Sequence, residues 1–299
     1  MPLTRHPIHQ RYLTTRCIRV LVSVTALALA LILPSSAIAA SAENSRQIIS
    51  VTERLYQFTD GDAAGAFMLG DTTAVVIDPM NDSVAAWLNS EIQSRFNLTV
   101  SHVVYSSHLP QRTGGAQLFP DATIIAHANL SDKLQNSAEP PSIVFTESLT
   151  IRLDDQAVTL FAAGPSVTDD ALVAHFPSEN AMYAGDLVAI ERLPGVSADQ
   201  LAKARASRWA SSVERINRID FVYLLTSHQG VGIQNDSRKH ALFLRELVYR
   251  ISRALAKGES VESIRDSVRM ENYKHWGGYD NISQLVEATA LALQAESAR

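Results

Sequence analysis

Residues that could bind a metal ion or move a proton lie in three separate parts of this sequence. The segment Val103–Gly115 begins apolar, continues through polar residues that include His108, and ends in a pair of glycines. Asp186 and His228 each follow a later apolar run. Imidazole nitrogens and carboxylates are zinc ligands, and they are also common general acids and bases. The chemistry therefore depends on which of these side chains the fold brings together.

The first segment resembles the first metal motif of the metallo-β-lactamase superfamily. That motif follows a strand and reads His-x-His-x-Asp-His, then one residue, then often Gly-Gly. With the glycine pair as anchor, its four ligand positions fall on Ser107, Leu109, Gln111 and Arg112. None of these side chains is a zinc ligand, because zinc binds imidazole nitrogen, thiolate or carboxylate. His108 lies between the two histidine positions, where alternation along an extended chain turns it the other way.

Further segments match landmarks of the superfamily in the same order along the chain. Asp78 ends a run that resembles the buried Ile-Asp strand, which makes it a candidate pocket residue. Val167 lies in a Gly-Pro-Ser-Val-Thr segment that normally reads Gly-Pro-x-His-Thr, so it replaces a zinc-binding histidine. Asp186 matches the carboxylate that bridges two zinc ions, and His228 matches the last histidine. The resemblance implies that two of seven ligands remain.

The resemblance implies an α+β fold, the four-layer αββα sandwich of the metallo-β-lactamase type. In active members, two zinc ions generate a hydroxide that attacks lactam, ester or thioester bonds. A catalytic zinc needs about three protein ligands, and Asp186 and His228 supply two. We therefore expect no cofactor, with zinc as the alternative if His108 completes the set. Asp186 and His228 are the candidate catalytic residues if any turnover survives.

An unpaired carboxylate in an emptied metal pocket would be costly, since burial of a lone charge is strongly unfavourable. Arg112 stands at a lost histidine position, stays charged under ordinary conditions, and has a planar fork that suits a carboxylate. We expect an Arg112–Asp186 pair, with His228 nearby, as the electrostatic centre of the pocket. The alternative is that Arg112 points into solvent.

The sequence favours a non-hydrolytic role, in which the cleft binds a small molecule or a periplasmic protein partner. One alternative is a hydrolase with an altered site built from His108, Asp186 and His228. Another is a metal-free hydrolase with Ser107 as nucleophile and with His228 and Asp186 as base and orienting group. A nucleophile-elbow pattern is absent from the sequence. A purely structural accessory subunit is a further alternative.

The first 40 residues have the layout of a cleavable secretory signal. Four arginines precede the apolar run Val20–Leu33, and small residues follow it. The run is short for a membrane span. We therefore expect a signal peptide at 1–40 and a periplasmic or secreted metallo-β-lactamase-like domain with a C-terminal helical tail at 41–299, without a stable membrane span after cleavage. Cys17, the single cysteine, would leave with the signal.

The expected mature chain is acidic. Removal of the four arginines leaves 22 Lys and Arg against 31 Asp and Glu, a net charge of −9. This charge argues against nucleic acid or an anionic membrane as a partner. About 260 residues are enough for one large domain with a substantial core.

Hydrophobic periodicity predicts the elements that must position these residues. The helices are expected at 84–96, 198–216, 237–257, 261–268 and 282–295. Beyond the short strands of 51–78, strands are expected at 100–105, 122–126, 150–153, 158–162, 172–176, 181–184 and 221–228. Trp87 and Leu242 are expected on buried helix faces. An aromatic turn at Tyr273–Tyr279 is similar to the tail of periplasmic members found with quinoprotein and sulfur-oxidation systems, and we interpret it as a clasp for the terminal helix.

Overall fold

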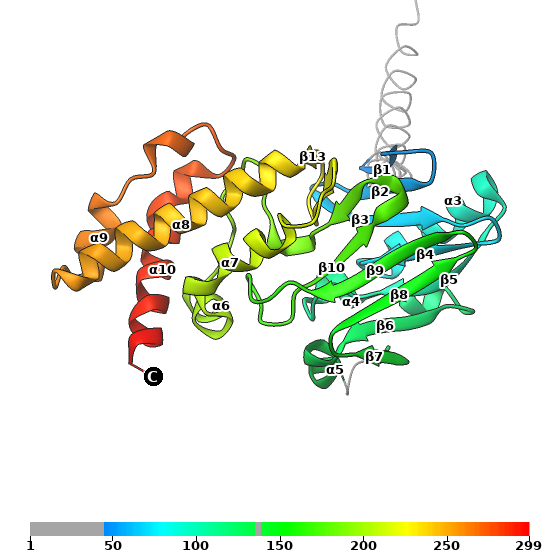
Figure 1. Ribbon diagram of the computed structural model, residues 1–299, viewed down its shortest axis with the longest axis horizontal. Coiled ribbons are helices and arrows are strands. Elements are labelled where there is room, and N and C mark those ends of the chain that lie inside the picture. The colour runs from blue at the N-terminus through cyan, green and yellow to red at the C-terminus, as the bar shows by residue number, and fades with distance from the viewer. Residues whose placement is uncertain (1–44, 135–138, 299) are drawn as a thin grey trace, which may run out of the picture. The chain divides into compact units, whose positions relative to one another are not determined.

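Two β-sheets lie face to face in the computed structural model, which describes residues 45–134 and 139–298 (Figure 1). Helices cover the outer face of each sheet, so the expected α+β, four-layer αββα sandwich is confirmed. The expected signal at 1–40 lies outside the described residues. None of the helices within the described ranges is long and apolar enough to cross a membrane.

The first sheet has seven strands that are neighbours in chain order. They are β1 (Arg46–Ser50), β2 (Leu55–Asp60), β3 (Ala63–Leu69), β4 (Thr73–Ile77), β5 (Thr99–Val104), β6 (Thr123–His127) and β7 (Ile143–Phe145). The first four strands are antiparallel, and β4 to β7 are parallel. The carboxyl ends of β4 and β5 therefore meet at one edge of the sheet.

The second sheet has six strands in the spatial order β13, β12, β11, β10, β9, β8. They are β8 (Ser148–Leu153), β9 (Gln156–Ala162), β10 (Leu172–Phe176), β11 (Ala181–Tyr183), β12 (Tyr223–Leu225) and β13 (Val231–Ile233). Only β11 and β12 pair in parallel among these described strands. Asp186 follows β11 and His228 follows β12, so both come from neighbouring strand ends.

The nearly continuous apolar sequences of β3 and β4 arise because these strands are buried on both faces. Met68 and Ile77 contribute to the core between the sheets. Their neighbours Phe67 and Val76 point to the other side, into the core under the first helix. Side chains alternate along a strand, so one apolar run supplies two cores.

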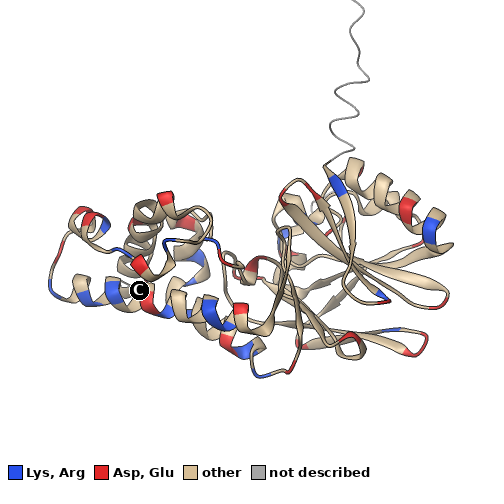
Figure 2. Ribbon diagram, turned by 90° about the horizontal axis from the view of Figure 1, so that it is seen from above, with Lys and Arg blue, Asp and Glu red and all other residues tan. Residues whose placement is uncertain are grey.

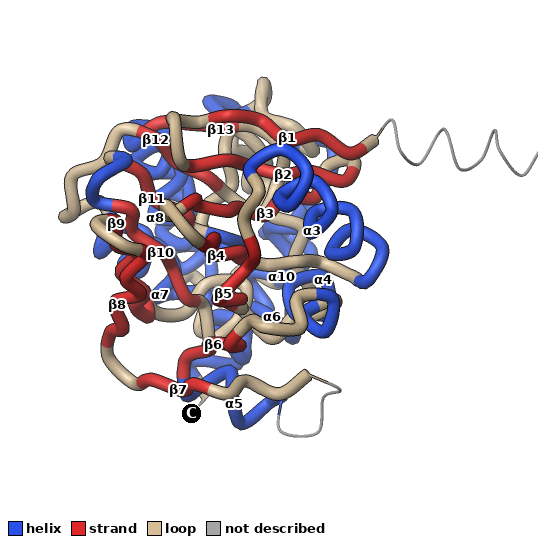
Figure 3. The backbone as a smooth tube through the Cα atoms, turned by 90° about the vertical axis from the view of Figure 1, so that its right-hand side faces the viewer, coloured by secondary structure: helices blue, strands red, loops and turns tan. Residues whose placement is uncertain are grey.

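The tube view shows α3 beside the strands of the first sheet and the helices of the second half behind the strands (Figure 3). Beside the first sheet are α3 (Asp82–Phe96), α4 (Pro110–Thr113), a 3-10 turn (Ala116–Leu118) and α5 (Ala128–Leu134). Beside the second sheet are α7 (Ala206–Ile216) and α8 (Gln234–Ala256). The other three helices, α6 (Ala198–Ala204), α9 (Val261–Ser267) and α10 (Ile282–Ser297), pack against these two and against one another. Short 3-10 turns occur at Pro177–Glu179, Gly185–Leu187, Glu271–Tyr273 and Tyr279–Asn281.

Helix α3 begins where the Asn81 side chain accepts a hydrogen bond from the Val84 amide at 3.0 Å. This cap satisfies one of the free amides of the first helical turn. Leu88 and Ile92 are fully buried on the face toward the first sheet. Trp87, expected in the core, is only half-buried because it lies at the edge of that face.

Three expectations about the second half are corrected by the structure. The helix expected at 198–216 is two helices, because Arg205 adopts a left-handed φ of 63° between them. The strand expected at 221–228 is ordered as a strand only over Tyr223–Leu225. Leu242 is 59% exposed, since the buried face of α8 runs through Ala241, Leu244 and other residues at helical spacing.

The basic residues of α8 lie among acidic ones (Figure 2). Arg245 pairs with Glu214, and Arg250 pairs with Glu246 at 2.6 Å. Lys239 contacts Glu191 at 2.9 Å. These ion pairs are exposed, so each contributes little to stability.

The aromatic turn contacts α8 rather than the terminal helix alone. Trp276 is 4% exposed, and its ring centroid lies 5.0 Å from that of Phe243 and 4.8 Å from that of Tyr273. His240 lies fully buried in the same cluster, 5.7 Å from the ring of Trp209. The clasp therefore joins the tail to the core outside the second sheet.

Candidate functional site

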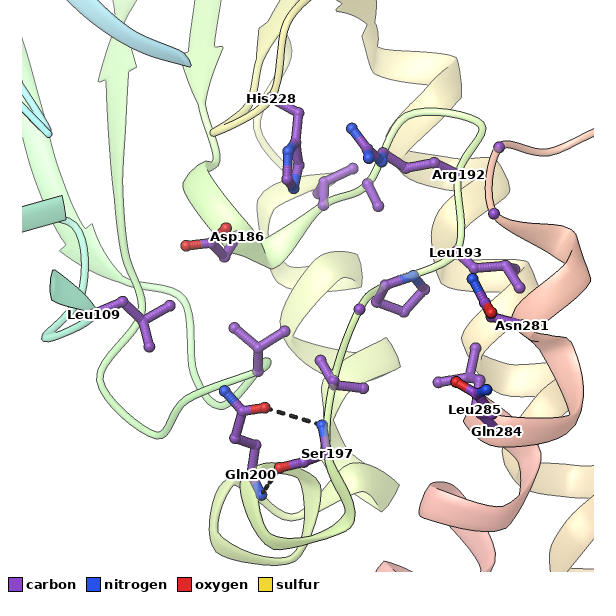
Figure 4. A pocket seen from close by; sticks show the side chains of 18 of the residues that line it. Leu109, Asp186, Arg192, Leu193, Ser197, Gln200, His228, Asn281, Gln284 and Leu285 are labelled. Carbon is purple, nitrogen blue, oxygen red and sulfur yellow. Dashed lines mark hydrogen bonds between the residues drawn. The ribbon is translucent and has the colours of Figure 1, made fainter. Parts of the chain in front are cut away.

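A pocket of about 580 Å³ lies where the ends of the central strands meet the loops of the second half (Figure 4). Of the nine candidate site residues, six line it: Leu109, Gln111, Arg112, Val167, Asp186 and His228. The other three candidates, Ser107, His108 and Asp78, do not line it. Six of the seven metal-motif positions, all except Ser107, thus line one pocket, although the sequence separates them widely.

An ion pair between Arg112 and Asp186 forms the floor of the pocket. The Nε and Nη2 atoms of Arg112 donate to the two carboxylate oxygens of Asp186, each at 2.9 Å. The hydroxyl of Ser227 donates to the same carboxylate. The side chain of Arg112 is 3% exposed and that of Asp186 is 12% exposed. The expected pairing is confirmed, and it uses both oxygens of the carboxylate that remains from the metal motif.

Local structure fixes both partners of this pair. Arg112 lies in α4, whose first residue is Pro110, and proline is favoured at a helix start. Asp186 lies in a 3-10 turn whose first residue, Gly185, has a φ of 51°. An added Cβ at Gly185 would approach the Ser106 hydroxyl to 3.1 Å, so glycine suits this close approach.

Burial and ion pairing have opposite effects on Asp186. Burial alone would raise the pKa of this carboxyl, but hydrogen bonds and charge from Arg112 outweigh it and hold the pKa below the usual value. For Arg112, burial favours the neutral form, yet Asp186 raises the net pKa of the guanidinium above its usual value. Both groups are therefore charged at neutral pH.

Asp78 belongs to a buried hydrogen-bond network instead of lining the pocket, which corrects the expectation from the sequence. Its carboxylate accepts from the Ser106 amide at 2.7 Å, the Ser106 hydroxyl at 2.5 Å and the Tyr183 hydroxyl at 2.7 Å. Burial raises its pKa to about 6, although the charge of Arg112 opposes this. The network joins β4, β5 and β11 beneath the floor, so its role is to hold the strand ends together.

His108 does not line the pocket, as expected, although it lies in a bend after β5 rather than on an extended strand. Its Nδ1 lies 2.6 Å from Oδ2 of Asp170. The Lys133 ammonium approaches the same oxygen at 2.9 Å. The altered site built from His108, Asp186 and His228 is therefore not assembled, because His108 is engaged elsewhere.

Ser107 is 2% exposed, and its hydroxyl has no hydrogen-bond partner within the described residues. The orienting acid expected for it, Asp186, is engaged by Arg112 and Ser227. The serine-hydrolase arrangement considered from the sequence is thus not formed.

His228 lines the pocket from a loop that is tied to the first sheet. The Ala64 amide donates to the Ser227 carbonyl at 2.9 Å, and the buried Gln57 side chain donates to the His228 carbonyl at 3.3 Å. The imidazole Nδ1 lies 3.4 Å from Asp62. Burial, followed by the charge of Arg192, lowers the pKa of His228 below its usual value. The ring is therefore neutral at pH 7.

Sequence reasoning missed the outer wall of the pocket. This wall comes from the loop after β11, from the first turn of α6, and from the 3-10 turn before α10 and the first turn of that helix (Figure 4). Its members include Arg192, Leu193, Gln200, Asn281, Gln284 and Leu285. The periodic pattern that predicts α10 gives no sign that its first turn faces the strand ends, so no local signal in the sequence would have found these residues.

No protein-family model matches the sequence. Among solved structures, a metallo-β-lactamase from Pontibacter korlensis matches with a TM-score of 0.60 at 17% identity over 67% of this chain and 99% of that chain. VMB-1 matches with 0.59 at 21% identity over 68% and 97%. The DIM-1 metallo-β-lactamase matches with 0.59 at 18% identity over 68% and 98%. The chain therefore has the metallo-β-lactamase fold.

The residues present do not fit the zinc site that this fold implies. Within residues 45–134 and 139–298, no three His, Cys, Asp or Glu side chains are grouped so that they could hold a metal ion. Asp186 and His228 are two ligands where about three per zinc are needed. Both oxygens of Asp186 already accept from Arg112, whose positive charge disfavours a nearby cation.

Proposed function

We propose that this chain is an exported protein of the metallo-β-lactamase fold that binds a small molecule in its strand-end pocket without hydrolysing it. One observation supports this most directly: the Arg112 guanidinium bonds both oxygens of Asp186. Arg112 thus occupies the centre of the metal site that the fold implies. Breaking its buried ion pair with Asp186 would cost much free energy, so Arg112 stays in place. Export is proposed from the arginine-rich, apolar and small-residue pattern of residues 1–40.

The lining supports binding more than hydrolysis. Four of the motif positions, now Leu109, Gln111, Arg112 and Val167, line the pocket with groups that neither bind zinc nor act as bases at neutral pH. His228 is the remaining base, and no nucleophile among the described lining residues is paired with it. The pocket volume of about 580 Å³ is in the range typical of small-molecule sites.

Two measurements test this proposal. In the first, the mature protein is incubated with a chromogenic β-lactam, a thioester and an activated ester, with and without added zinc. Turnover should equal that of a boiled control. Zinc-dependent turnover that disappears in the His228→Ala variant would instead establish the altered-site hydrolase.

In the second measurement, a fragment library is screened by ligand-observed NMR. Fragments should bind the wild type and lose binding in the Gly195→Trp variant, because the indole would fill part of the pocket that Gly195 lines. The backbone should tolerate this change, since an added Cβ at Gly195 meets no atom within 4 Å. The exposed Leu242→Trp variant is the control and should bind like the wild type. Equal binding by both variants would place the ligand site elsewhere.

A further inference from the structure

We propose that the pocket recognises an uncharged ligand that carries amide groups on an aliphatic frame. This inference rests on the proposed function and adds the chemical class of the ligand. It comes from a contrast within the lining: the charged groups are already paired inside the protein, whereas three of the four side-chain amides are not, the exception being Gln200, whose Oε1 accepts from the Ser197 amide at 2.9 Å.

The charges that line the described pocket are neutralised by protein partners. Arg112 and Asp186 pair with each other through two hydrogen bonds of 2.9 Å. The Nη1 atom of Arg192 donates to the two oxygens of Asp62 at 2.8 and 2.7 Å. A charged ligand group would therefore meet no cation or anion that lacks a partner, and it would lose its hydration without compensation.

His228 also has a protein carboxylate within reach, because its Nδ1 lies 3.4 Å from a carboxylate oxygen of Asp62. A neutral imidazole offers one donor or acceptor to a ligand, depending on its tautomer.

Three primary amides line the pocket without a hydrogen-bond partner among the described residues. They belong to Gln111, Asn281 and Gln284. Gln111 comes from α4. Asn281 ends the 3-10 turn before α10, and Gln284 lies in the first turn of that helix (Figure 4). Each primary amide supplies one acceptor and two donors, which is the complement of another amide. The polar recognition available in this pocket is thus neutral and directional.

The remaining surface of the pocket is aliphatic. Leu109 and Val167 lie on the inner side, and Leu193, Pro194 and Leu285 lie on the outer side. No Phe, Tyr or Trp lines the pocket as described, so no flat face is offered for a planar ring to stack on. Aliphatic groups bound to amides, as in a blocked aliphatic amino acid, match both parts of this lining.

Three probes that differ at one terminal group test the ligand class. They are N-acetyl-leucine amide, which is neutral, N-acetyl-leucine, which is an anion, and leucine amide, which is a cation at pH 7. Binding is measured by NMR titration of the isotope-labelled protein. The neutral probe should bind at least about 10-fold more tightly than either charged probe. An equal or stronger response to the anion, or no response to the neutral probe, would overturn the inference.

Substitutions test whether the unpaired amides contribute to binding of the neutral probe. Asn281→Leu and Gln284→Leu remove the amide from exposed positions, and each should weaken the neutral probe several-fold. Gln294→Leu makes the same type of change at an exposed position of the same helix, away from the pocket, and should leave binding unchanged. Equal affinities for all three variants and the wild type would contradict the role of the amides.

The two proposals fail in different ways. Release of ammonia from the neutral probe, with binding intact, would overturn the non-hydrolytic function and keep the ligand class. Absence of binding to the neutral probe, with fragment binding still lost in Gly195→Trp, would overturn the ligand class and keep the function.

Discussion

Removal of Arg112 should expose the cost of a buried carboxylate in the emptied site. Truncation of one partner of a buried pair costs about 3 to 5 kcal/mol, and the 12% exposure of Asp186 places it toward the lower end. Arg112→Ala should therefore destabilise the protein more than Arg112→Ala combined with Asp186→Ala. Urea unfolding of the two single variants and the double variant measures this coupling.

An exposed pair provides the control for this cycle. Arg54 and Asp71 contact at 2.8 Å, but their side chains are 35% and 55% exposed. Arg54→Ala should leave the free energy of unfolding nearly unchanged, because solvent screens an exposed ion pair. Additive effects at Arg112 and Asp186 would mean that the two side chains do not depend on each other.

His240 is expected to reduce the stability of the protein at low pH. It is fully buried, and neither ring nitrogen has a hydrogen-bond partner in the described structure. Burial lowers its pKa from 6.5 to about 3, so the unfolded chain binds more protons than the folded chain between these values. Stability present above pH 6.5 is then lost as the pH falls toward 3, by up to about 1.4 kcal/mol per pH unit.

The variant His240→Leu should remove this dependence and raise the melting temperature at neutral pH, because it eliminates two unsatisfied buried nitrogens. Thermal unfolding from pH 4 to pH 7 tests both effects. His275→Leu makes the same change at an exposed histidine of the aromatic turn and should retain the slope of the wild type. A slope in His240→Leu as steep as that of the wild type would refute the assignment.

At the scale of elements, the glycine pair explains how the loop after β5 fits against α3. Gly115 has a φ of 92°, and an added Cβ would lie 2.7 Å from both the Asn81 carbonyl oxygen and the Ala85 Cβ. Asn81 is also the cap of α3. A side chain at Gly115 would therefore push the loop that carries Arg112 away from the helix start.

Gly115→Ala should accordingly lower the free energy of unfolding by more than the conformational cost of placing a non-glycine residue at a positive φ. Gly258 has a φ of 79° and open space around it, so Gly258→Ala isolates the conformational cost of about 1 to 2 kcal/mol. The loss at Gly115 should exceed that value, because steric overlap adds to it. Urea unfolding of both variants measures the two losses of unfolding free energy. Equal losses would show that the loop moves to accept the added methyl group without a further energetic cost.

At the scale of the whole molecule, folding should not depend on zinc. The residues that couple folding to a metal are replaced, and a metal that does not bind the native state cannot stabilise it. The melting temperature should stay the same in EDTA and after zinc is restored. Elemental analysis of protein prepared without added metal should find less than one zinc per chain. A drop of several degrees in EDTA that zinc reverses would contradict this expectation.

The sequence by itself determined the sandwich and the centre of its pocket. The order of the motifs carried the resemblance that implied the sandwich, and hydrophobic periodicity predicted the individual helices and strands, because both signals depend on near neighbours along the chain. The Arg112–Asp186 pair followed because a retained carboxylate without its metal needs a positive partner. The orientation of His108 away from the pocket was also expected, but its basis in the structure is the bend after β5 and the contact with Asp170, not alternation along a strand.

Tertiary structure alone decided which residues surround that centre. Asp78 lies under the floor because three strands meet there. Asn281 and Gln284 reach the pocket because the packing of α10 against α6 and α8 brings its first turn, and the 3-10 turn before it, to the strand ends. The break at Arg205 and the exposure of Leu242 depend on which helix faces find a partner. These features depend on contacts between distant parts of the chain, and local patterns do not encode such contacts.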